Sequence, residues 1–154
     1  MNGARQSRFV AVDTRVLRGA NAPIDTRAPK PGSIFAARHR LLRRIVEGNY
    51  VVLVSRRLLG EYREQIPRPL GDFVTAFFAL LGTPARWRCN WQRRWRGERA
   101  AARQCRFPPH DDHVLRTAIR KDGAESTLFA EEPALPAADA CIHRRFAVHI
   151  LPPD

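Results

Sequence analysis

The sequence lacks any apolar run long enough to cross a membrane, and it lacks a Gly-rich phosphate-binding loop. A membrane-spanning helix needs about 20 predominantly apolar residues, so we expect no membrane segment. Residues 1–8 are polar and basic, but the apolar run that follows is too short, and too soon followed by charge, to be a signal peptide. We therefore predict a cytoplasmic protein, and one that is not a P-loop nucleotide-binding protein.

Cysteine is scarce, with only Cys89, Cys105 and Cys141 in the chain. An odd number of cysteines without close spacing predicts reduced thiols in a cytosolic protein rather than a disulfide framework. The set Cys89, Cys105, His110 and His113 could suggest a zinc site, but it contains no Cys-x-x-Cys pair and its spacing matches no common zinc site.

Positive charge is the strongest feature of the composition. Lys and Arg number 27 against 15 Asp and Glu, which gives a net charge of +12. Polyanions such as nucleic acids are the natural partners of such a chain. Since nearly all of these basic residues are Arg, a GC-rich genome is one alternative explanation, and an acidic protein partner is another. The length of 154 residues and the 44% hydrophobic content predict one folded domain over residues 1–154.

Apolar periodicity predicts alternating strands and helices. Short apolar runs predict strands over 9–14, 50–54, 125–129 and 146–151, and helical spacing predicts helices over 34–46, 56–65, 72–81 and from 110 to near 123. Residues 133–143 are helical or irregular. Ser33 and Ser55 are suited to cap two of these helices, and Gly48 is suited to a left-handed helix end. This order predicts an α/β fold, a three-layer α/β/α sandwich with a mainly parallel central sheet.

A basic segment over about 84–106 contains Trp87, Trp91 and Trp95 at four-residue spacing. On a helix these indoles would form one stripe, able to stack on unpaired RNA bases while guanidinium groups contact phosphates. The alternative is that the Trp side chains pack into the domain or a dimer interface and the Arg side chains only solvate the outer face. The candidate RNA-binding residues are Arg86, Arg88, Trp91, Arg93, Arg94 and Arg96.

Four carboxylates occupy comparable places relative to the expected strands. Asp13 ends the first strand, Glu61 lies on the helix after the second, Asp112 begins a helix, and Glu131 follows the third strand. In a parallel sheet these positions converge at the carboxyl edge, where ligands bind. Clustered carboxylates repel one another unless cations neutralise them, and oxygen ligands suit Mg²⁺ or Mn²⁺. The alternative for Asp13 is a helix cap.

Three sequence blocks resemble the PIN-domain nucleases, in particular toxin components of bacterial toxin–antitoxin pairs. They are Phe9-Val10-Ala11-Val12-Asp13-Thr14, then Val54-Ser55 with Leu58-Leu59-Gly60-Glu61-Tyr62, and then Asp111-Asp112 with Val114-Leu115. The resemblance implies that Asp13, Glu61, Asp112 and Glu131 are catalytic, with Asp13, Asp112 and Glu131 binding Mg²⁺ or Mn²⁺. It also implies RNA cleavage by a metal-bound water and a small antitoxin partner; a homodimer is a further expectation.

Within the third block, Asp112 is preferred over Asp111 as the ligand, because it sets Val114 and Leu115 at the apolar offsets of the family, leaving Asp111 as a cap. The chain departs from the family pattern at Arg15, Phe129 and Pro133, where the family has Asn, a small hydroxyl residue and a further Asp. These departures support a rival hypothesis: a degenerate PIN-like RNA-binding or protein-interaction protein in which Arg15 pairs with Asp13 and replaces the metal. A third hypothesis is a phosphohydrolase that acts on small substrates.

Overall fold

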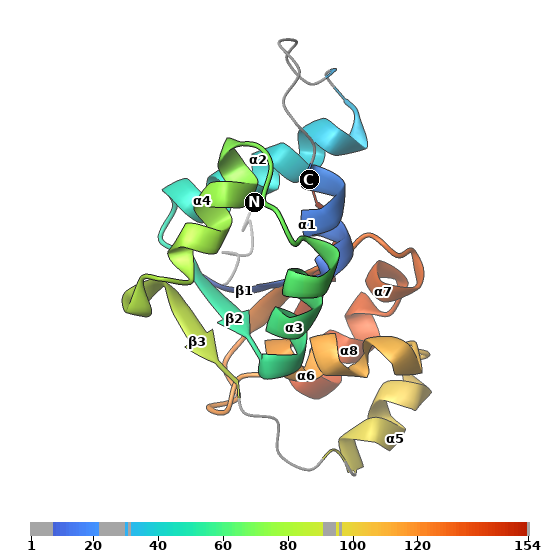
Figure 1. The fold of residues 1–154 in the computed structure, drawn as a ribbon. Helices are drawn as coiled ribbons and strands as arrows, with labels where there is room; N and C mark the ends of the chain where they lie inside the picture. The colour runs from blue at the N-terminus through green and yellow to red at the C-terminus, as the bar shows by residue number, and fades with distance from the viewer. Residues whose placement is uncertain (1–7, 22–29, 31, 91–94, 96, 154) are drawn as a thin grey trace, which may run out of the picture.

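The protein was analysed as a computed structural model, which describes residues 8–21, 30, 32–90, 95 and 97–153. Five parallel strands form one sheet in the order β3-β2-β1-β4-β5 (Figure 1). The strands are β1 (Phe9–Val12), β2 (Val51–Val54), β3 (Trp87–Cys89), β4 (Ser126–Phe129) and β5 (Val148–Leu151). The predicted α/β sandwich is confirmed.

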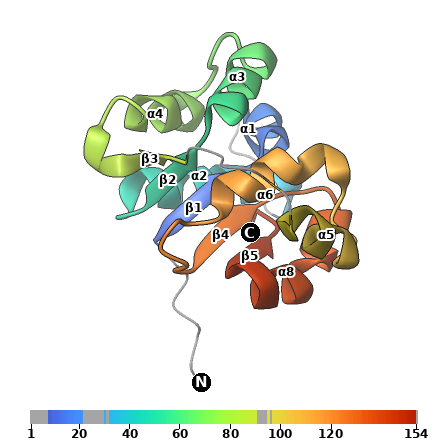
Figure 2. The ribbon, with the colours of Figure 1, turned by 90° about the horizontal axis from the view of Figure 1, so that it is seen from below.

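Eight α-helices connect the strands in the described part of the chain. They are α1 (Thr14–Ala20), α2 (Ile34–Glu47), α3 (Arg56–Gln65), α4 (Asp72–Leu80), α5 (Gly97–Gln104), α6 (Asp112–Ala118), α7 (Ala134–Ala137) and α8 (Asp139–Phe146). Two 3-10 turns, η1 (Pro84–Arg86) and η2 (Pro109–Asp111), precede β3 and α6. Figures 1 and 2 show α2 and α4 on one side of the sheet and α6 and α8 on the other.

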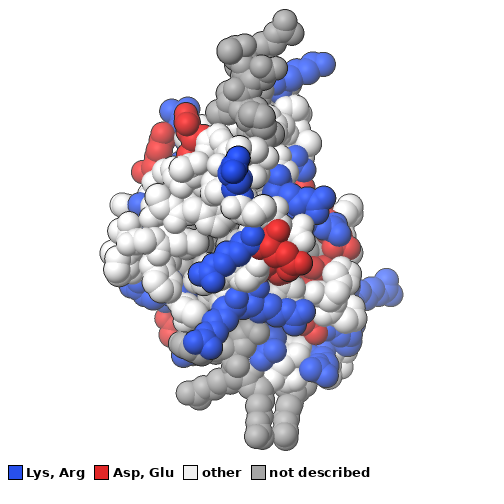
Figure 3. Space-filling view, viewed as in Figure 1, with Lys and Arg blue, Asp and Glu red and all other residues white. Residues whose placement is uncertain are grey.

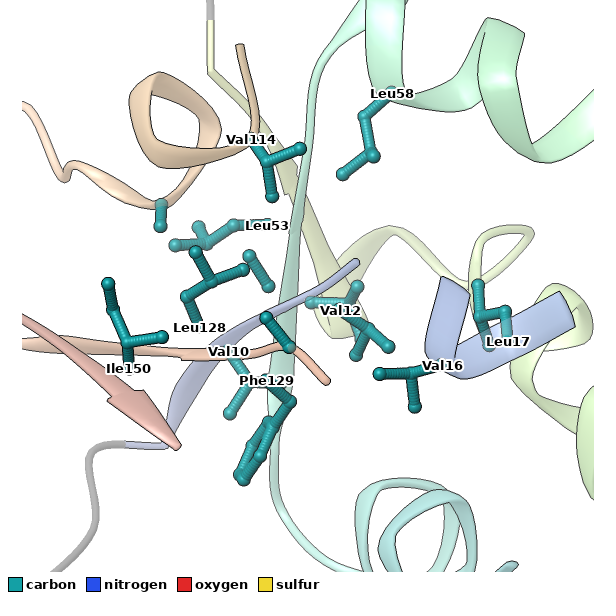
Figure 4. Packing of buried hydrophobic residues seen from close by; sticks show 14 of the residues in the cluster. Val10, Val12, Val16, Leu17, Leu53, Leu58, Val114, Leu128, Phe129 and Ile150 are labelled. Carbon is teal, nitrogen blue, oxygen red and sulfur yellow. The ribbon is translucent and has the colours of Figure 1, made fainter. Parts of the chain in front are cut away.

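The first apolar run forms the central strand of the sheet. β1 pairs with β2 on one side and with β4 on the other. Val10, Ala11 and Val12 are fully buried because helices cover both faces of a parallel sheet. Leu58 of α3 and Val114 of α6 pack on one side of this strand (Figure 4).

Short polar residues start the helices as predicted. The Ser33 hydroxyl accepts a hydrogen bond from the Ala36 N–H at 3.1 Å, and the Ser55 hydroxyl accepts one from the Leu58 N–H at 3.2 Å. Each hydroxyl satisfies a backbone donor that has no partner within its helix. Gly48 ends α2, but its φ of −89° is not left-handed, so that prediction is wrong. A glycine suits this position because a Cβ there would lie 2.6 Å from the Arg44 carbonyl oxygen.

The basic segment does not form one continuous helix. Trp87 lies in β3 and Trp95 precedes α5, so the expected single stripe of indoles is wrong for these two residues. A strand forms at Trp87 because its backbone pairs with Val52 of β2, a long-range contact that four-residue spacing does not reveal. Both side chains are half-buried against the core.

Cys105 and Cys141 form a disulfide, with Cα atoms 5.4 Å apart. This corrects the expectation of three reduced thiols, since only Cys89 remains free. The two cysteines are 36 residues apart in the sequence, and the packing of the chain brings them together. Among the described residues, no helix combines the length and the apolar character needed to cross a membrane.

Candidate functional site

Asp13 lies where β1 ends and α1 begins, at the point where the strand order changes direction between β1 and β4. Connections leave a parallel sheet to opposite sides at such a point, and ligands commonly bind there. The Asp13 carboxylate accepts a hydrogen bond from the Thr14 N–H at 2.9 Å and so also serves as the N-cap of α1. Both interpretations of Asp13, as a cap and as a residue at the sheet edge, therefore hold for this position.

The surroundings of Asp13 disfavour its negative charge. The pKa of Asp13 is raised from 3.8 to about 6. Burial is the largest cause, the charges of Glu61 and Glu132 contribute to the rise, and the Thr14 hydrogen bond and Arg15 oppose it. Only 5% of the residue is exposed. At pH 7 the carboxylate is mainly ionised, and a nearby cation would stabilise it.

Asp111, rather than Asp112, is the carboxylate that faces this cluster. η2 ends at Asp111, which is buried, and its pKa also rises to about 6. Burial is the largest cause; His110 opposes the rise, whereas Asp13 and Glu132 contribute to it. Asp111 Oδ2 is buried and forms an ion pair with His110, whose Nε2 atom lies 3.1 Å away.

Asp112, in contrast, hydrogen-bonds to the guanidinium of Arg103. The preference for Asp112 rested on the spacing of apolar residues, and spacing does not separate two adjacent acids at the start of a helix. The two side chains leave the start of the helix in different directions, so Asp111 faces the sheet edge and Asp112 faces Arg103 of α5. The structure thus favours Asp111 as the site residue. Asp111 does stand at the N-cap position of α6, as expected, but its side chain makes no capping hydrogen bond there.

The adjacent acids Glu131 and Glu132 also contact different partners. Glu131 forms a two-pronged ion pair with Arg38, with Nη2 and Oε2 2.7 Å apart. Glu132 instead lies beside His110, with Nε2 and Oε2 3.6 Å apart. Donor atoms of His110, Asp111 and Glu132 all lie within 4.8 Å of one another, a spacing that one metal ion could bridge.

Arg15 does not form the predicted ion pair with Asp13. Its guanidinium is 3.7 Å from Glu132, and its side chain is 61% exposed. Phe129 and Pro133 also have structural roles. The Phe129 carbonyl accepts a hydrogen bond from the Asp13 N–H at 2.9 Å, which ties the end of β4 to the site, and Pro133 caps α7.

Glu61 reaches the site from α3 and hydrogen-bonds to His113 of α6. His113 is buried, whereas Glu61 is partly exposed. Glu61 is close enough for its charge to raise the pKa of Asp13. Beneath it, the buried Tyr62 hydroxyl donates to the Val12 carbonyl and fixes α3 against β1. Of the four predicted acids, the structure thus brings Asp13 and Glu61 together, while Asp112 and Glu131 are paired with arginines.

Sequence reasoning considered Asp111 but preferred Asp112, and it did not assign His110, His113 or Glu132 to this site. Asp111 and Glu132 were each visible as the neighbour of a predicted ligand, and a paired-acid motif could have signalled both members. The two histidines carried no sequence signal beyond their proximity to the Asp-Asp pair.

Ser55 serves as a helix cap, as predicted. Its hydroxyl also accepts a hydrogen bond from Thr117 at 2.8 Å, which joins α3 to α6. No histidine side chain hydrogen-bonds to Ser55 among the described residues, so the geometry offers no activated nucleophile there.

The candidate RNA-binding residues are only partly within the described structure. Arg86 donates to the carbonyls of Ile45, Gly48 and Tyr50 at 2.8–2.9 Å, which gives it a structural role at the end of α2. Arg88 is exposed and donates to the Pro84 and Trp87 carbonyls. Trp91, Arg93, Arg94 and Arg96 lie outside the described residues. Figure 3 shows further Lys and Arg side chains around a smaller group of Asp and Glu side chains, on the face of the molecule seen in Figure 1.

Comparisons of the chain with models of protein families, with curated proteins and with solved structures find no match. The resemblance to PIN-domain nucleases therefore rests on the three sequence blocks alone.

Proposed function

We propose that the protein is a PIN-like ribonuclease that uses Mg²⁺ or Mn²⁺, held by Asp13, Asp111 and Glu132, to cleave phosphodiester bonds in RNA. One observation carries the proposal: carboxylates from three separate segments converge at the carboxyl edge of the sheet, and two of them have a pKa of about 6. Such a cluster is costly without a cation.

The cluster offers mainly oxygen donors, with His110 as a nitrogen donor beside Asp111 and Glu132, so a hard divalent cation fits these residues. A bound Mg²⁺ or Mn²⁺ would supply an activated water and stabilise the leaving oxygen. Glu61, which hydrogen-bonds to His113, lies beside this cluster and is suited to act as a general base. The net charge of +12 favours a polyanionic substrate such as RNA. A toxin role, with a small antitoxin that covers the site, follows from the family resemblance.

The rival function, RNA or protein binding without a metal, is favoured by a different observation. Three arginines already neutralise acids in or near the site, in the pairs Arg15–Glu132, Arg38–Glu131 and Arg103–Asp112. The proposal is preferred because no arginine in the described part of the chain pairs with Asp13 or Asp111, the two most buried acids of the cluster. Glu132 does contact an arginine, but this contact is long, at 3.7 Å, and the Arg15 side chain is exposed.

RNA cleavage tests the proposal directly. Purified protein with Mn²⁺ should cleave RNA, and Asp13→Asn should abolish cleavage while keeping the cap of α1, because Asn is also a good N-cap. Glu64→Gln, at an exposed position of α3, is the matched control and should cleave normally. Equal cleavage by Asp13→Asn would indicate a contaminant and refute the proposal.

Two further measurements separate the other hypotheses. RNA binding retained without detectable binding of Mg²⁺ or Mn²⁺ at millimolar concentration would favour the rival. RNA affinity that does not fall with rising salt would favour a phosphohydrolase of small substrates, since phosphate contacts release counterions.

A further inference from the structure

A second cluster of metal-binding side chains lies at the other end of β4. Glu125 immediately precedes β4, His143 lies on α8, and His149 lies on β5. One donor atom from each of the three residues lies within 4.8 Å of the other two. Figure 2 shows the elements that bring them together, with α8 beside β5 and β5 beside β4.

The histidine rings of this cluster are arranged in parallel. The ring centroids of His143 and His149 are 3.7 Å apart, with 16° between their planes. His143 Nε2 lies 2.7 Å from Glu125 Oε1, so a carboxylate lies beside the two rings.

A further carboxylate orients His149. Asp139 Oδ1 accepts a hydrogen bond from the Ile150 N–H at 2.7 Å and lies 3.4 Å from His149 Nδ1. A histidine that binds a metal through one ring nitrogen almost always hydrogen-bonds through the other, commonly to a carboxylate. An ion pair between His143 and Glu125 would not by itself explain why His149 lies against His143, or why His149 contacts Asp139.

The cluster is accessible to ions from solvent. Its three side chains are between 33% and 55% exposed. His143 also lines an open hollow of about 530 Å³. Glu125 and Asp139 offset the positive charge of the neighbouring Arg144 and Arg145, so a dication does not meet an entirely basic surface.

We propose that Glu125, His143 and His149 bind one transition-metal ion of the Zn²⁺ class. Two imidazoles with one carboxylate suit Zn²⁺, Co²⁺ or Ni²⁺, whereas Mg²⁺ prefers oxygen ligands. Three protein ligands leave a fourth position for water or an anion. This site is separate from the acidic cluster at Asp13 and does not depend on the function proposed above.

Calorimetric titration of the full chain with Zn²⁺ tests this site. The wild-type protein should bind one equivalent that excess Mg²⁺ does not displace. His143→Ala, His149→Ala and Glu125→Gln should each weaken binding at least tenfold, and Asp139→Asn, which keeps an acceptor for Ile150, by about 10-fold. Glu125 is exposed, so its variant should fold normally even if a histidine variant does not.

Asp13→Asn and Glu64→Gln serve as controls and should leave the Zn²⁺ affinity unchanged. Retention of Zn²⁺ binding by Asp13→Asn would support the second site even if RNA cleavage is never observed. Absence of Zn²⁺ binding tighter than millimolar in the wild type would overturn the proposal. Wild-type affinity in Glu125→Gln and both histidine variants, or loss of binding in Asp13→Asn alone, would do so as well.

Discussion

Asp13 places a charge in a buried position because the same side chain starts α1. Its carboxylate satisfies the Thr14 N–H, but one hydrogen bond does not replace the water that burial removes. The pKa of Asp13 is therefore raised to about 6, despite the opposing effects of Thr14 and Arg15.

The raised pKa predicts how stability depends on pH. The folded protein binds a proton at Asp13 more tightly than the unfolded chain does, so the free energy of unfolding should fall as pH rises from about 4 to about 6. Asp13→Asn should remove this loss and be more stable than the wild type at pH 7 by about 2–3 kcal/mol. Urea unfolding at several pH values measures both quantities. Parallel curves for wild type and variant over this range would contradict the assignment, and Glu64→Gln should follow the wild type.

The sequence identifies Arg86 as a candidate binding residue but does not reveal its structural role. The sequence places it in a basic, Trp-containing segment, which favours contact with phosphate. In the structure its guanidinium donates to three carbonyls at the end of α2 and the start of β2. The sequence does not show which backbone carbonyl oxygens lie close to a side chain, so only the three-dimensional packing reveals this role.

At the scale of elements, Arg86 joins α2 to the sheet from η1. Arg86→Lys keeps the charge but cannot reach several carbonyls from one planar group, so we expect a loss of about 1.5–3 kcal/mol in the free energy of unfolding. The matched control is Arg88→Lys, whose exposed contacts are local, with an expected change within about 0.5 kcal/mol. Urea unfolding compares the two. Equal losses in the two variants would contradict a structural role specific to Arg86.

The elements themselves were largely predictable, and the side-chain directions at their ends were not. Buried runs such as β1 and β2, and the capped helices α2 and α3, carry strong local signals. Strand β3 has three residues and is set by pairing with β2, so periodicity misses it. The choices between Asp111 and Asp112, and between Glu131 and Glu132, depend on single turns at element ends, where a shift of one residue reverses the outcome.

At the scale of the whole molecule, the disulfide joins α8 to the residue that follows α5. α5 also contacts α6 through the Arg103–Asp112 ion pair. The sequence could not predict this bond, because three distant cysteines allow several pairings and α5 and α8 are separated by β4. The expectation of reduced thiols is therefore wrong for Cys105 and Cys141.

The disulfide gives a direct chemical prediction. Under denaturing conditions, one thiol per molecule should react without reductant and three with it. Closing a loop of this length predicts that reduction lowers the free energy of unfolding by about 3–4 kcal/mol, through the greater entropy of the unfolded chain. Cys89→Ser should leave this difference unchanged. Three reactive thiols without reductant would contradict the pairing.

The central claim is that the carboxyl edge between β1 and β4 binds a divalent cation through Asp13, Asp111 and Glu132. Calorimetric titration with Mn²⁺ tests it most directly, because the chain offers matched pairs of adjacent acids. Asp111→Asn and Glu132→Gln should weaken Mn²⁺ binding at least tenfold, whereas Asp112→Asn and Glu131→Gln, which remove arginine-paired acids, should retain it. Thermal melting of each variant verifies folding. Equal affinities in all four variants, or loss confined to Asp112→Asn and Glu131→Gln, would contradict the account.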